Sequence, residues 1–170
     1  MRSHLVTSSP LGELTLVAQD GALVACLMDL PDRHPSDESL GVLAEDGSGD
    51  PVLGEAAAQL TEYFARERTE FSLPLAPEGD DFQQRVWALL CEIPYGQTRS
   101  YGDLARVLGD VNLSQRVGWA NGRNPISIIV PCHRVIGADG ALVGYAGGLE
   151  RKRFLLGLEE PPADEADRLF

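Results

Sequence analysis

The hydrophobic positions in the first part of the chain form short runs that turn residues interrupt. Between residues 5 and 30 the clearest interruption is the Asp20-Gly21 dipeptide, a strong hairpin signal. This pattern predicts a small antiparallel sheet. Residues 31 to 50 are rich in Pro, Asp, Ser and Gly, and they predict a mobile surface loop.

A helix and a short extended piece follow this loop. The helix is predicted from Val52 to Glu67, and residues 69 to 77 return as an extended segment. The segment PEGDD is typical of a linker. We therefore expect an amino-terminal structural domain of residues 1–77 and a second domain of residues 78–170. The apolar positions with helical spacing are Leu53, Ala56, Ala57, Leu60 and Phe64.

Helical periodicity dominates the second domain. One helix is predicted to end at Pro94, a second runs through Leu108, and a third continues towards Gly122. Two helices joined by a short turn form the helix-turn-helix pattern, although short helix pairs also occur in ordinary cores. Both interpretations stay open on spacing alone. Three pairs resemble capping boxes at the helix starts: Asp81 with Gln84, Ser100 with Asp103, and Asn112 with Gln115.

The last part of the chain contributes a turn and a closing helix. Asp139-Gly140 predicts a tight turn before a glycine-rich loop, and LERKRFLLGLE predicts the final helix. The whole pattern indicates an α+β fold. A small amino-terminal antiparallel sheet plus helix domain precedes a mostly helical carboxyl-terminal domain with a helix-turn-helix and a short wing-like hairpin.

The charge of the chain is unevenly distributed. The net charge is -12, which argues against a nucleic-acid partner. Residues 82 to 134, however, carry 3 acidic residues against 6 arginines. Screening beyond about 8 to 10 Å at cellular salt lets such a local surface act independently of the acidic remainder. The third predicted helix carries polar side chains and a glycine that suit a nucleic-acid groove: Ser114, Gln115, Arg116, Gly118, Asn121 and Arg123.

Three cysteines cannot all pair within one chain, and none has the spacing of a zinc ligand. We predict reduced thiols and no structural zinc. Cys26 and Cys91 lie in apolar patterns and are most simply packed as small hydrophobic residues. Cys132 differs because His133 and Arg134 follow it in IVPCHRVI. It is either an incidental thiol in a short buried strand or a nucleophile with a nearby base.

Cooperation between Cys132 and His133 requires a particular backbone. Neighbouring side chains of a regular strand point to opposite faces, so we predict that the chain turns at Pro131. The histidine also needs an acceptor on its second nitrogen to present the correct tautomer. Glu159, or another carboxylate of the last helix, is the candidate acceptor.

Two long stretches carry a family resemblance: FQQRVWALLCEIPYGQTRSYGDLARVLG and ANGRNPISIIVPCHRVIGADGALVGYAGGLERKRFLLGLE. They resemble the carboxyl-terminal domain of the O6-alkylguanine-DNA alkyltransferases, the methylated-DNA-protein-cysteine methyltransferases. The likeness covers about residues 81 to 159, with a looser likeness over the first 77. PCHRV preceded by NP and followed by GYxGG is a specific combination.

The resemblance implies direct-reversal DNA repair by a single-turnover methylated-DNA-[protein]-cysteine S-methyltransferase. An alkyl group, such as methyl, passes from O6 of guanine in duplex DNA to Cys132 after the base has been flipped from the minor groove. By the same likeness, His133 deprotonates the thiol through a water, Glu159 orients His133, and Asn124 holds the turn before the active-site segment.

The resemblance also implies a guanine pocket. Tyr101 matches a tyrosine that rotates the target nucleotide out of the stack and then binds the base. The other positions that match the pocket lining are Val135, Tyr145, Ala146 and Gly147. Ala146 lacks the hydroxyl that some family members have there.

One position departs from the family pattern. The family's intercalating arginine corresponds to Gln115, and the arginine occurs one residue later as Arg116. One residue rotates a helical side chain by about 100°. Either Gln115 fills the space left by the flipped base, or the helix shifts and Arg116 does.

The remaining expectations concern partners and location. We expect double-stranded DNA containing O6-alkylguanine as the partner, a monomeric protein with cooperativity on DNA left open, and no metal or other cofactor. The amino terminus has no apolar stretch of signal-peptide length and no segment approaches a membrane span, which predicts a cytoplasmic protein without membrane contact.

Two other functions are compatible with parts of the sequence. The first is a non-catalytic damaged-base-binding protein of the alkyltransferase-like type, against which the presence of Cys132 argues. The second is a Cys-His-Glu hydrolase, which would need an oxyanion pocket and would have no use for the helix pair.

Overall fold

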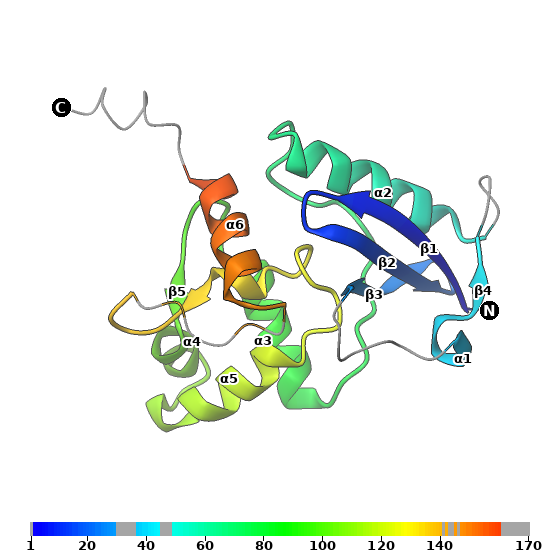
Figure 1. The fold of residues 1–170 in the computed structure, drawn as a ribbon. Helices are drawn as coiled ribbons and strands as arrows, with labels where there is room; N and C mark the ends of the chain where they lie inside the picture. The colour runs from blue at the N-terminus through cyan, green and yellow to red at the C-terminus, as the bar shows by residue number, and fades with distance from the viewer. Residues whose placement is uncertain are drawn as a thin grey trace.

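The computed structural model describes residues 2–29, 37–44, 49–140, 142, 145 and 147–160. Figure 1 shows a sheet with one long helix beside a group of helices formed by the rest of the chain. The predicted α+β class is confirmed. The strands are β1 (Arg2–Ser9), β2 (Gly12–Gln19), β3 (Ala22–Met28), β4 (Val42–Leu43), β5 (Arg99–Ser100) and β6 (Val135–Ile136). The helices are α1 (Asp37–Leu40), α2 (Pro51–Phe64), α3 (Asp81–Cys91), α4 (Tyr101–Val107), α5 (Ser114–Gly122) and α6 (Leu149–Glu159), with 3-10 turns η1 (Val111–Leu113) and η2 (Cys132–Arg134).

The predicted antiparallel sheet is present, with the strand order β3-β2-β1-β4. Asp20 and Gly21 connect β2 to β3 with φ angles of 53° and 84°. Two central residues with positive φ are typical of a type I′ hairpin turn, whose twist matches the strands it joins. Of the predicted surface loop, residues 31–36 and 45–48 lie outside the described residues, and the loop prediction is wrong where regular structure forms between them. Within it, α1 and the two-residue strand β4 are formed, and β4 pairs parallel to β1.

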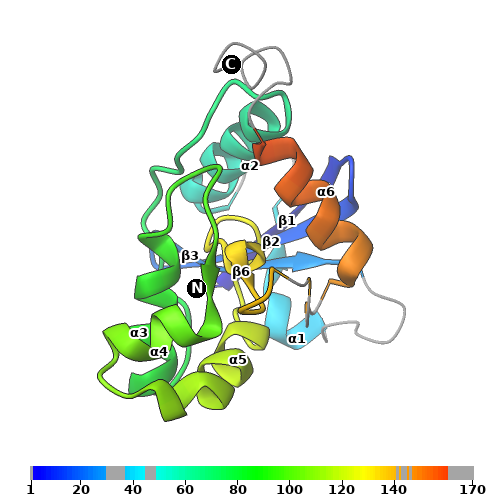
Figure 2. The same cartoon turned by 90° about the vertical axis from the view of Figure 1, so that its left-hand side faces the viewer.

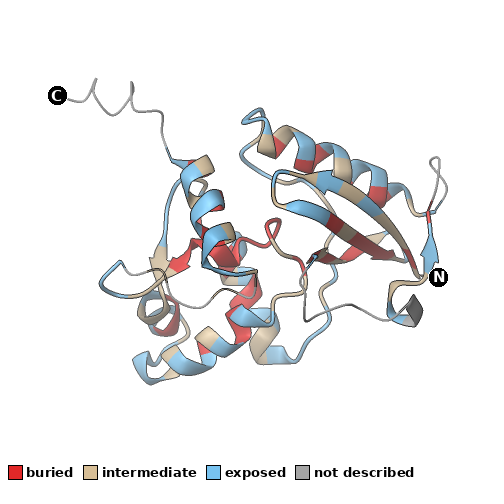
Figure 3. Cartoon of the chain, in the orientation of Figure 1, coloured by how far each residue is buried: buried red, intermediate tan, exposed pale blue. Residues whose placement is uncertain are grey.

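Helix α2 covers one face of this sheet, and the buried residues lie between the two layers (Figure 3). It begins at Pro51, where the Asp50 side chain accepts a hydrogen bond from the Val52 N–H at 3.1 Å. It ends at Phe64, earlier than predicted, because Arg66 adopts a φ of 63°. A left-handed residue just past the last turn is a common helix terminator.

The predicted capping of α3 is wrong by one residue. Asp80 is the N-cap: its side chain accepts from the Gln83 N–H, and the Gln83 side chain accepts from the Asp80 N–H. The Gln84 side-chain amide instead donates to the Pro77 carbonyl at 2.6 Å. The predicted capping box of α4 is confirmed, since Ser100 and Asp103 exchange the two hydrogen bonds.

The predicted cap on the third helix is also wrong. Asp110 caps η1 by accepting from the Asn112 N–H at 2.9 Å, and α5 continues from η1 without a side-chain cap. The Ser114 N–H donates to the Val111 carbonyl, so the turn itself supplies the partner that a cap would provide. Helices α4 and α5 pack together across η1 as the predicted helix-turn-helix (Figure 2).

The outer edge of β3 ties the two parts together. Leu23 forms a parallel bridge to Leu75, as expected for an extended segment there, and Cys26 forms a second bridge to Ile126. The Cys26 N–H donates to the Pro125 carbonyl at 2.9 Å, and the Ser127 N–H donates to the Cys26 carbonyl at 3.1 Å. The sheet therefore fixes the segment that leads to Cys132.

The predicted wing-like hairpin lies partly outside the described residues, which omit 141, 143, 144 and 146. Its turn is present, because the Gly140 N–H donates to the Gly137 carbonyl at 2.9 Å. Strands β5 and β6 pair in parallel and join the start of α4 to the end of η2. Within the described ranges, no helix combines the length and apolar character that crossing a membrane requires.

Candidate functional site

Two tight turns shape the backbone before Cys132. Pro131 has φ -81° and ψ 65°, and the Cys132 N–H donates to the Val130 carbonyl at 2.8 Å. These values define an inverse γ-turn. The chain then enters the 3-10 turn η2, which confirms the predicted departure from strand geometry at Pro131. Cys132 and His133 therefore do not point to opposite faces of a strand.

Ile128 forms the other turn and is strained. Its φ is 72°, and the Ile129 N–H donates to the Ser127 carbonyl at 2.8 Å across it. A β-branched residue in this region costs about 1 to 3 kcal/mol. The Ile128 side chain is 1% exposed, and burial of such a side chain contributes about 1.5 to 3 kcal/mol. Packing thus holds the strained turn in place.

Asn124 joins both turns to the end of α5. Its side-chain amide donates to the Ile126 and Val130 carbonyls at 3.3 and 2.8 Å, and its oxygen accepts from the Ile126 N–H at 3.0 Å. These bonds satisfy the backbone groups of the loop that contains Ile128. Asn124 therefore occupies the position that the family resemblance implied, between the helix and the active-site segment.

The Cys132 side chain is almost enclosed, with 5% of its surface exposed. Burial raises the pKa of the thiol, while the nearby Asn124 amide, the charge of Lys152 and the hydroxyl of Tyr145 act to lower it. The net direction is upward, so the group is a neutral thiol at neutral pH. A base is needed to generate the thiolate, which is the nucleophilic form.

His133, the next residue, is fully buried and carries an imidazole, a group that is able to act as such a base. Its Nε2 lies 2.7 Å from Oε2 of Glu159. Because an ionised carboxylate can only accept, Nε2 carries the proton and Nδ1 is left with a lone pair. Nδ1 is buried and has no hydrogen-bond partner among the described residues. Burial is the largest influence on the pKa of His133 and lowers it, so the imidazole is neutral.

Glu159 is the centre of a buried network that the sequence did not predict in full. Arg134 donates to it through Nε at 2.8 Å and through a terminal nitrogen at 3.0 Å, and Tyr63 of α2 donates at 2.5 Å. Burial alone would raise the pKa of Glu159, but the hydrogen bonds from His133, Arg134 and Tyr63 outweigh it and hold this pKa at about 2.

Sequence reasoning noted Arg134 beside the cysteine but gave it no role. Its second terminal nitrogen also donates to the Ile93 carbonyl at 2.6 Å, so the guanidinium links η2 to the end of α3. Lys152 of α6 was missed as well: it is fully buried, and its ammonium donates to the Val135 carbonyl at 2.6 Å. A basic residue inside the predicted last helix gave no sign of this burial.

Of the residues that the resemblance assigns to a guanine pocket, Tyr101 and Tyr145 lie close enough to Cys132 to interact with it electrostatically. Tyr101 begins α4, and its ring faces Gly118 of α5, where an added Cβ would lie 3.6 Å from it. The buried Tyr145 hydroxyl has no partner with normal hydrogen-bond geometry among the described residues. A Cβ on Gly147 would lie 2.6 Å from the Met28 sulfur and 2.8 Å from the Tyr145 ring, so a larger residue there would displace these side chains. Val135 is fully buried in β6, and Ala146 lies outside the described residues.

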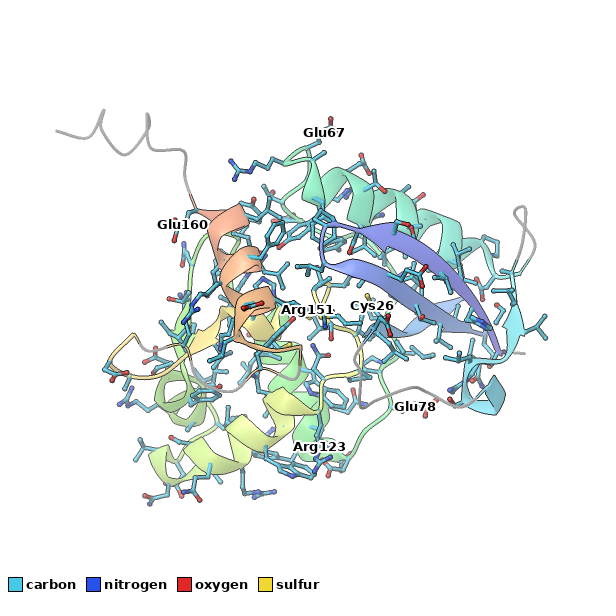
Figure 4. The ribbon with its side chains drawn as sticks, in the orientation of Figure 1. Cys26, Glu67, Glu78, Arg123, Arg151 and Glu160 are labelled. Atoms are coloured by element: carbon cyan, nitrogen blue, oxygen red, sulfur yellow. The ribbon has the colours of Figure 1, made fainter. Side chains whose placement is uncertain are left out.

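The exposed face of α5 presents a different set of residues from the predicted one. Asn121 is 3% exposed and donates to the Cys132 carbonyl at 3.4 Å, so its predicted contact with DNA is corrected to a support of the active-site backbone. The Ser114 hydroxyl donates to the Val111 carbonyl. Trp119, which the sequence analysis did not select, is 52% exposed and stacks with Arg123 at 4.2 Å. Figure 4 places Arg123 at the end of α5, away from the sheet.

Gln115 and Arg116 are both exposed on α5. The Arg116 guanidinium lies 4.1 Å from the centre of the Phe82 ring of α3. This cation–π contact directs Arg116 back over the neighbouring helix.

The other cysteines differ from each other. Cys26 is buried in β3, and burial raises its pKa to about 12, as expected for a packed thiol. The prediction that Cys91 is packed is wrong, because this last residue of α3 is exposed. In the part of the chain that the structure describes, no group of three His, Cys, Asp or Glu side chains is placed to hold a metal ion.

The fold and the site together define a protein with a buried cysteine next to an imidazole–carboxylate pair, preceded in the chain by a helix-turn-helix. Two family models match the chain: the 6-O-methylguanine DNA methyltransferase DNA binding domain over residues 81–161, and the ribonuclease-like domain of the same protein over residues 3–77. The chain belongs to the 6-O-methylguanine DNA methyltransferase family.

Individual relatives support the same assignment. The methylated-DNA–protein-cysteine methyltransferase of Mycobacterium leprae is 50% identical over 152 residues, which cover 89% of this chain and 88% of that protein. The crystal structure of the Mycobacterium tuberculosis O6-methylguanine methyltransferase is 46% identical, covers 98% of both chains and has a TM-score of 0.84. A structure of the M. tuberculosis OGT in complex with DNA is 47% identical, covers 92% of both chains and has a TM-score of 0.82.

Proposed function

We propose that this protein repairs double-stranded DNA by transferring a methyl or other alkyl group from O6 of guanine to Cys132 in a single turnover. The single observation that carries the proposal is the enclosed thiol of Cys132 beside the neutral, carboxylate-held imidazole of His133, behind the helix-turn-helix. The relatives' printed names describe methyl transfer from DNA to a protein cysteine, and one relative has been solved with DNA.

The step is a direct displacement at carbon. His133 accepts the thiol proton through a water, the sulfur forms a bond to the alkyl carbon, and the bond from that carbon to O6 breaks. The electron pair of the broken bond stays on the base, which takes up a proton and so becomes an unmodified guanine that remains part of the DNA strand. The protein keeps a stable thioether, so each molecule acts once. No metal, nucleotide or flavin takes part in this proposal.

Access to the sulfur requires base flipping. O6 is out of reach within a stacked duplex, and Cys132 is 5% exposed, so the base has to enter the protein. In the proposal, Tyr101 at the start of α4 turns the nucleotide from the minor groove. Val135, Tyr145, Ala146 and Gly147 line the pocket. Asn124 holds the loop that presents the sulfur.

Measuring the intact mass of the protein after incubation with an O6-methylguanine duplex tests the proposal. We expect each protein molecule to gain one methyl group on Cys132 while the oligonucleotide loses one. Binding without a change of mass would instead indicate a damaged-base-binding protein of the alkyltransferase-like type. Repeated turnover of another substrate would indicate a hydrolase.

We also propose that Gln115, rather than Arg116, fills the space left by the flipped base, because Arg116 is engaged with Phe82. A neutral amide in this position retains the extruded state less well than an arginine. Gln115→Arg is therefore expected to raise the affinity for O6-methylguanine duplex DNA by about 3- to 10-fold, through one added cationic contact. Fluorescence anisotropy at two salt concentrations measures the change.

The matched control is Ala58→Arg, which adds the same charge at an exposed position of α2. Helices α2 and α5 lie on opposite sides of the molecule in Figure 1. This control is expected to leave affinity and repair rate unchanged. If Gln115→Arg and the unaltered protein bound O6-methylguanine duplex DNA with equal affinity, a side chain other than Gln115 would fill the space left by the flipped base.

The proposal also includes the domain organisation of the chain, its DNA contacts, its oligomeric state and its location in the cell. We propose a structural domain of residues 1–77 and a DNA-binding and alkyl-transfer domain of residues 78–170. The DNA contacts come from the α5 region, through Gln115, Arg116 and Arg123 with close backbone approach at Gly118 and Ser114. The protein acts as a monomer in the cytoplasm.

A further inference from the structure

The amino-terminal domain places one polar group inside the active-site network. Tyr63 of α2 is fully buried, and its hydroxyl donates to Oε2 of Glu159 at 2.5 Å, across a separation of 96 residues in the chain. Glu159 is at the end of α6, so this bond joins the two parts of the molecule at the site itself.

Aromatic packing fixes the direction of this hydroxyl. The Tyr63 ring packs against Phe64 and Phe71 with ring centres 5.2 and 5.3 Å away, and against Tyr95 at 6.3 Å. Edge and tilted contacts of this kind are favourable for aromatic pairs. Because burial and the nearby Glu159 both raise the pKa of Tyr63, the phenol keeps its proton and remains a donor.

The acceptor atom is shared with the catalytic imidazole. Oε2 of Glu159 also lies 2.7 Å from Nε2 of His133 and accepts from Arg134 at 3.0 Å. A carboxylate oxygen that already accepts a hydrogen bond from a phenol attracts a further proton less strongly. The strength with which Glu159 attracts a proton on His133 therefore depends on Tyr63.

We propose that Tyr63 is a positioning residue for alkyl transfer, acting through Glu159. Its hydroxyl takes up part of the charge on Oε2 and so keeps the His133 imidazole neutral and able to accept the Cys132 proton. This inference rests on the proposed function. It gives the amino-terminal domain a direct part in the reactivity of the thiol, beyond structural support.

Other ionisable groups also surround the imidazole and carboxylate. They are Cys132 and Arg134 of η2, Lys152 of α6, Tyr95 after α3, and Arg66 after α2, which acts on Tyr95. Tyr95 supplies a matched control, because its hydroxyl donates at 3.2 Å to the backbone carbonyl of Leu158 and not to the carboxylate. Tyr63→Phe and Tyr95→Phe each remove one phenolic oxygen beside the end of α6.

The experiment uses the full chain carrying Cys91→Ser, so that iodoacetamide does not react with that exposed thiol. The rate of Cys132 alkylation by iodoacetamide is measured against pH by mass spectrometry, and the titration of His133 is followed by nitrogen-15 NMR. Transfer from an O6-methylguanine duplex is measured in parallel.

In Tyr63→Phe, the stronger pull of Glu159 raises the pKa of His133. The acid limb of the rate profile is then expected to move to higher pH by roughly half a unit, and transfer at a pH on this limb to fall by about threefold, the factor to which half a pKa unit corresponds. Tyr95→Phe is expected to change neither. A merely structural role would lower the melting temperature and leave the His133 titration where it is.

The inference would be overturned if Tyr63→Phe and Tyr95→Phe gave the same His133 titration and the same dependence of the alkylation rate on pH. Failure of the proposed function has a different signature, namely absence of methyl transfer by the unaltered protein. The iodoacetamide and NMR measurements do not depend on DNA, so they still decide the role of Tyr63.

Discussion

Cys132→Ser is expected to lower methyl transfer from an O6-methylguanine duplex by more than about a thousandfold, to the level of the uncatalysed reaction. The hydroxyl of serine is far less acidic than a thiol, and neutral His133 is too weak a base to ionise it. The measurement is intact mass after single-turnover incubation. DNA affinity should remain, because Cys132 is 5% exposed and lies behind the helix-turn-helix.

Cys91→Ser is the control for this variant. Cys91 is exposed at the end of α3 and has no place in the site network, so its loss should leave transfer and melting temperature unchanged. Methyl transfer by Cys132→Ser at the normal rate would show that the acceptor is another residue. Loss of transfer in the Cys91→Ser protein would point to the same conclusion.

Glu159→Gln is expected to produce the second largest effect, on both activity and stability. The amide cannot hold the Nε2–H tautomer of His133 as a carboxylate does, and loss of such an outer partner typically costs 10- to 100-fold in activity. The change also leaves the guanidinium of Arg134, which is 7% exposed, without its counter-ion. Removing one member of a buried pair destabilises a protein by about 3 to 5 kcal/mol. Chemical denaturation measures this loss.

The stability difference should depend on pH. The pKa of Glu159 in the folded protein is about 2, below the value of about 4.3 for an unfolded chain. A depressed pKa contributes stability that is fully present above the unfolded value and is lost as the pH falls through the folded value. The gap between the unaltered protein and Glu159→Gln should therefore narrow from about pH 4 down to about pH 2.

The neighbouring carboxylate supplies the control for Glu159→Gln. Glu160 is exposed at the end of α6 (Figure 4), so Glu160→Gln makes the same chemical change outside the network. We expect normal transfer and stability for this variant. If Glu159→Gln and Glu160→Gln lowered transfer and stability equally, the loss of one negative charge, rather than the loss of the buried contacts, would explain the effect.

Local signals predicted much of this molecule correctly. The type I′ turn at Asp20-Gly21, the capping box at Ser100 and the break at Pro131 all arise from interactions within a few residues, and each lies where the sequence placed it. The resemblance around Cys132 indicated the contact between His133 and Glu159, which the structure contains.

The sequence predictions are wrong where two local arrangements of the chain are both possible. Asp80 and Asp81 can both cap α3, and in the structure Asp80 is the cap while Gln84 donates to the Pro77 carbonyl. Cys91 occupies an apolar helix pattern, yet it falls on the exposed side at the helix end. Neither outcome can be derived from spacing, because each depends on which surface the rest of the chain covers.

The sequence by itself determined the small antiparallel sheet, the longer helices, and the cysteine with its imidazole neighbour, because short-range backbone and side-chain chemistry governs them. Only the tertiary structure decided that Arg134 and Tyr63 converge on Glu159, that Asn121 faces inwards and that Arg116 turns towards Phe82. These contacts join distant segments. Their geometry follows from how the sheet, α2 and α6 pack together, which no local pattern encodes.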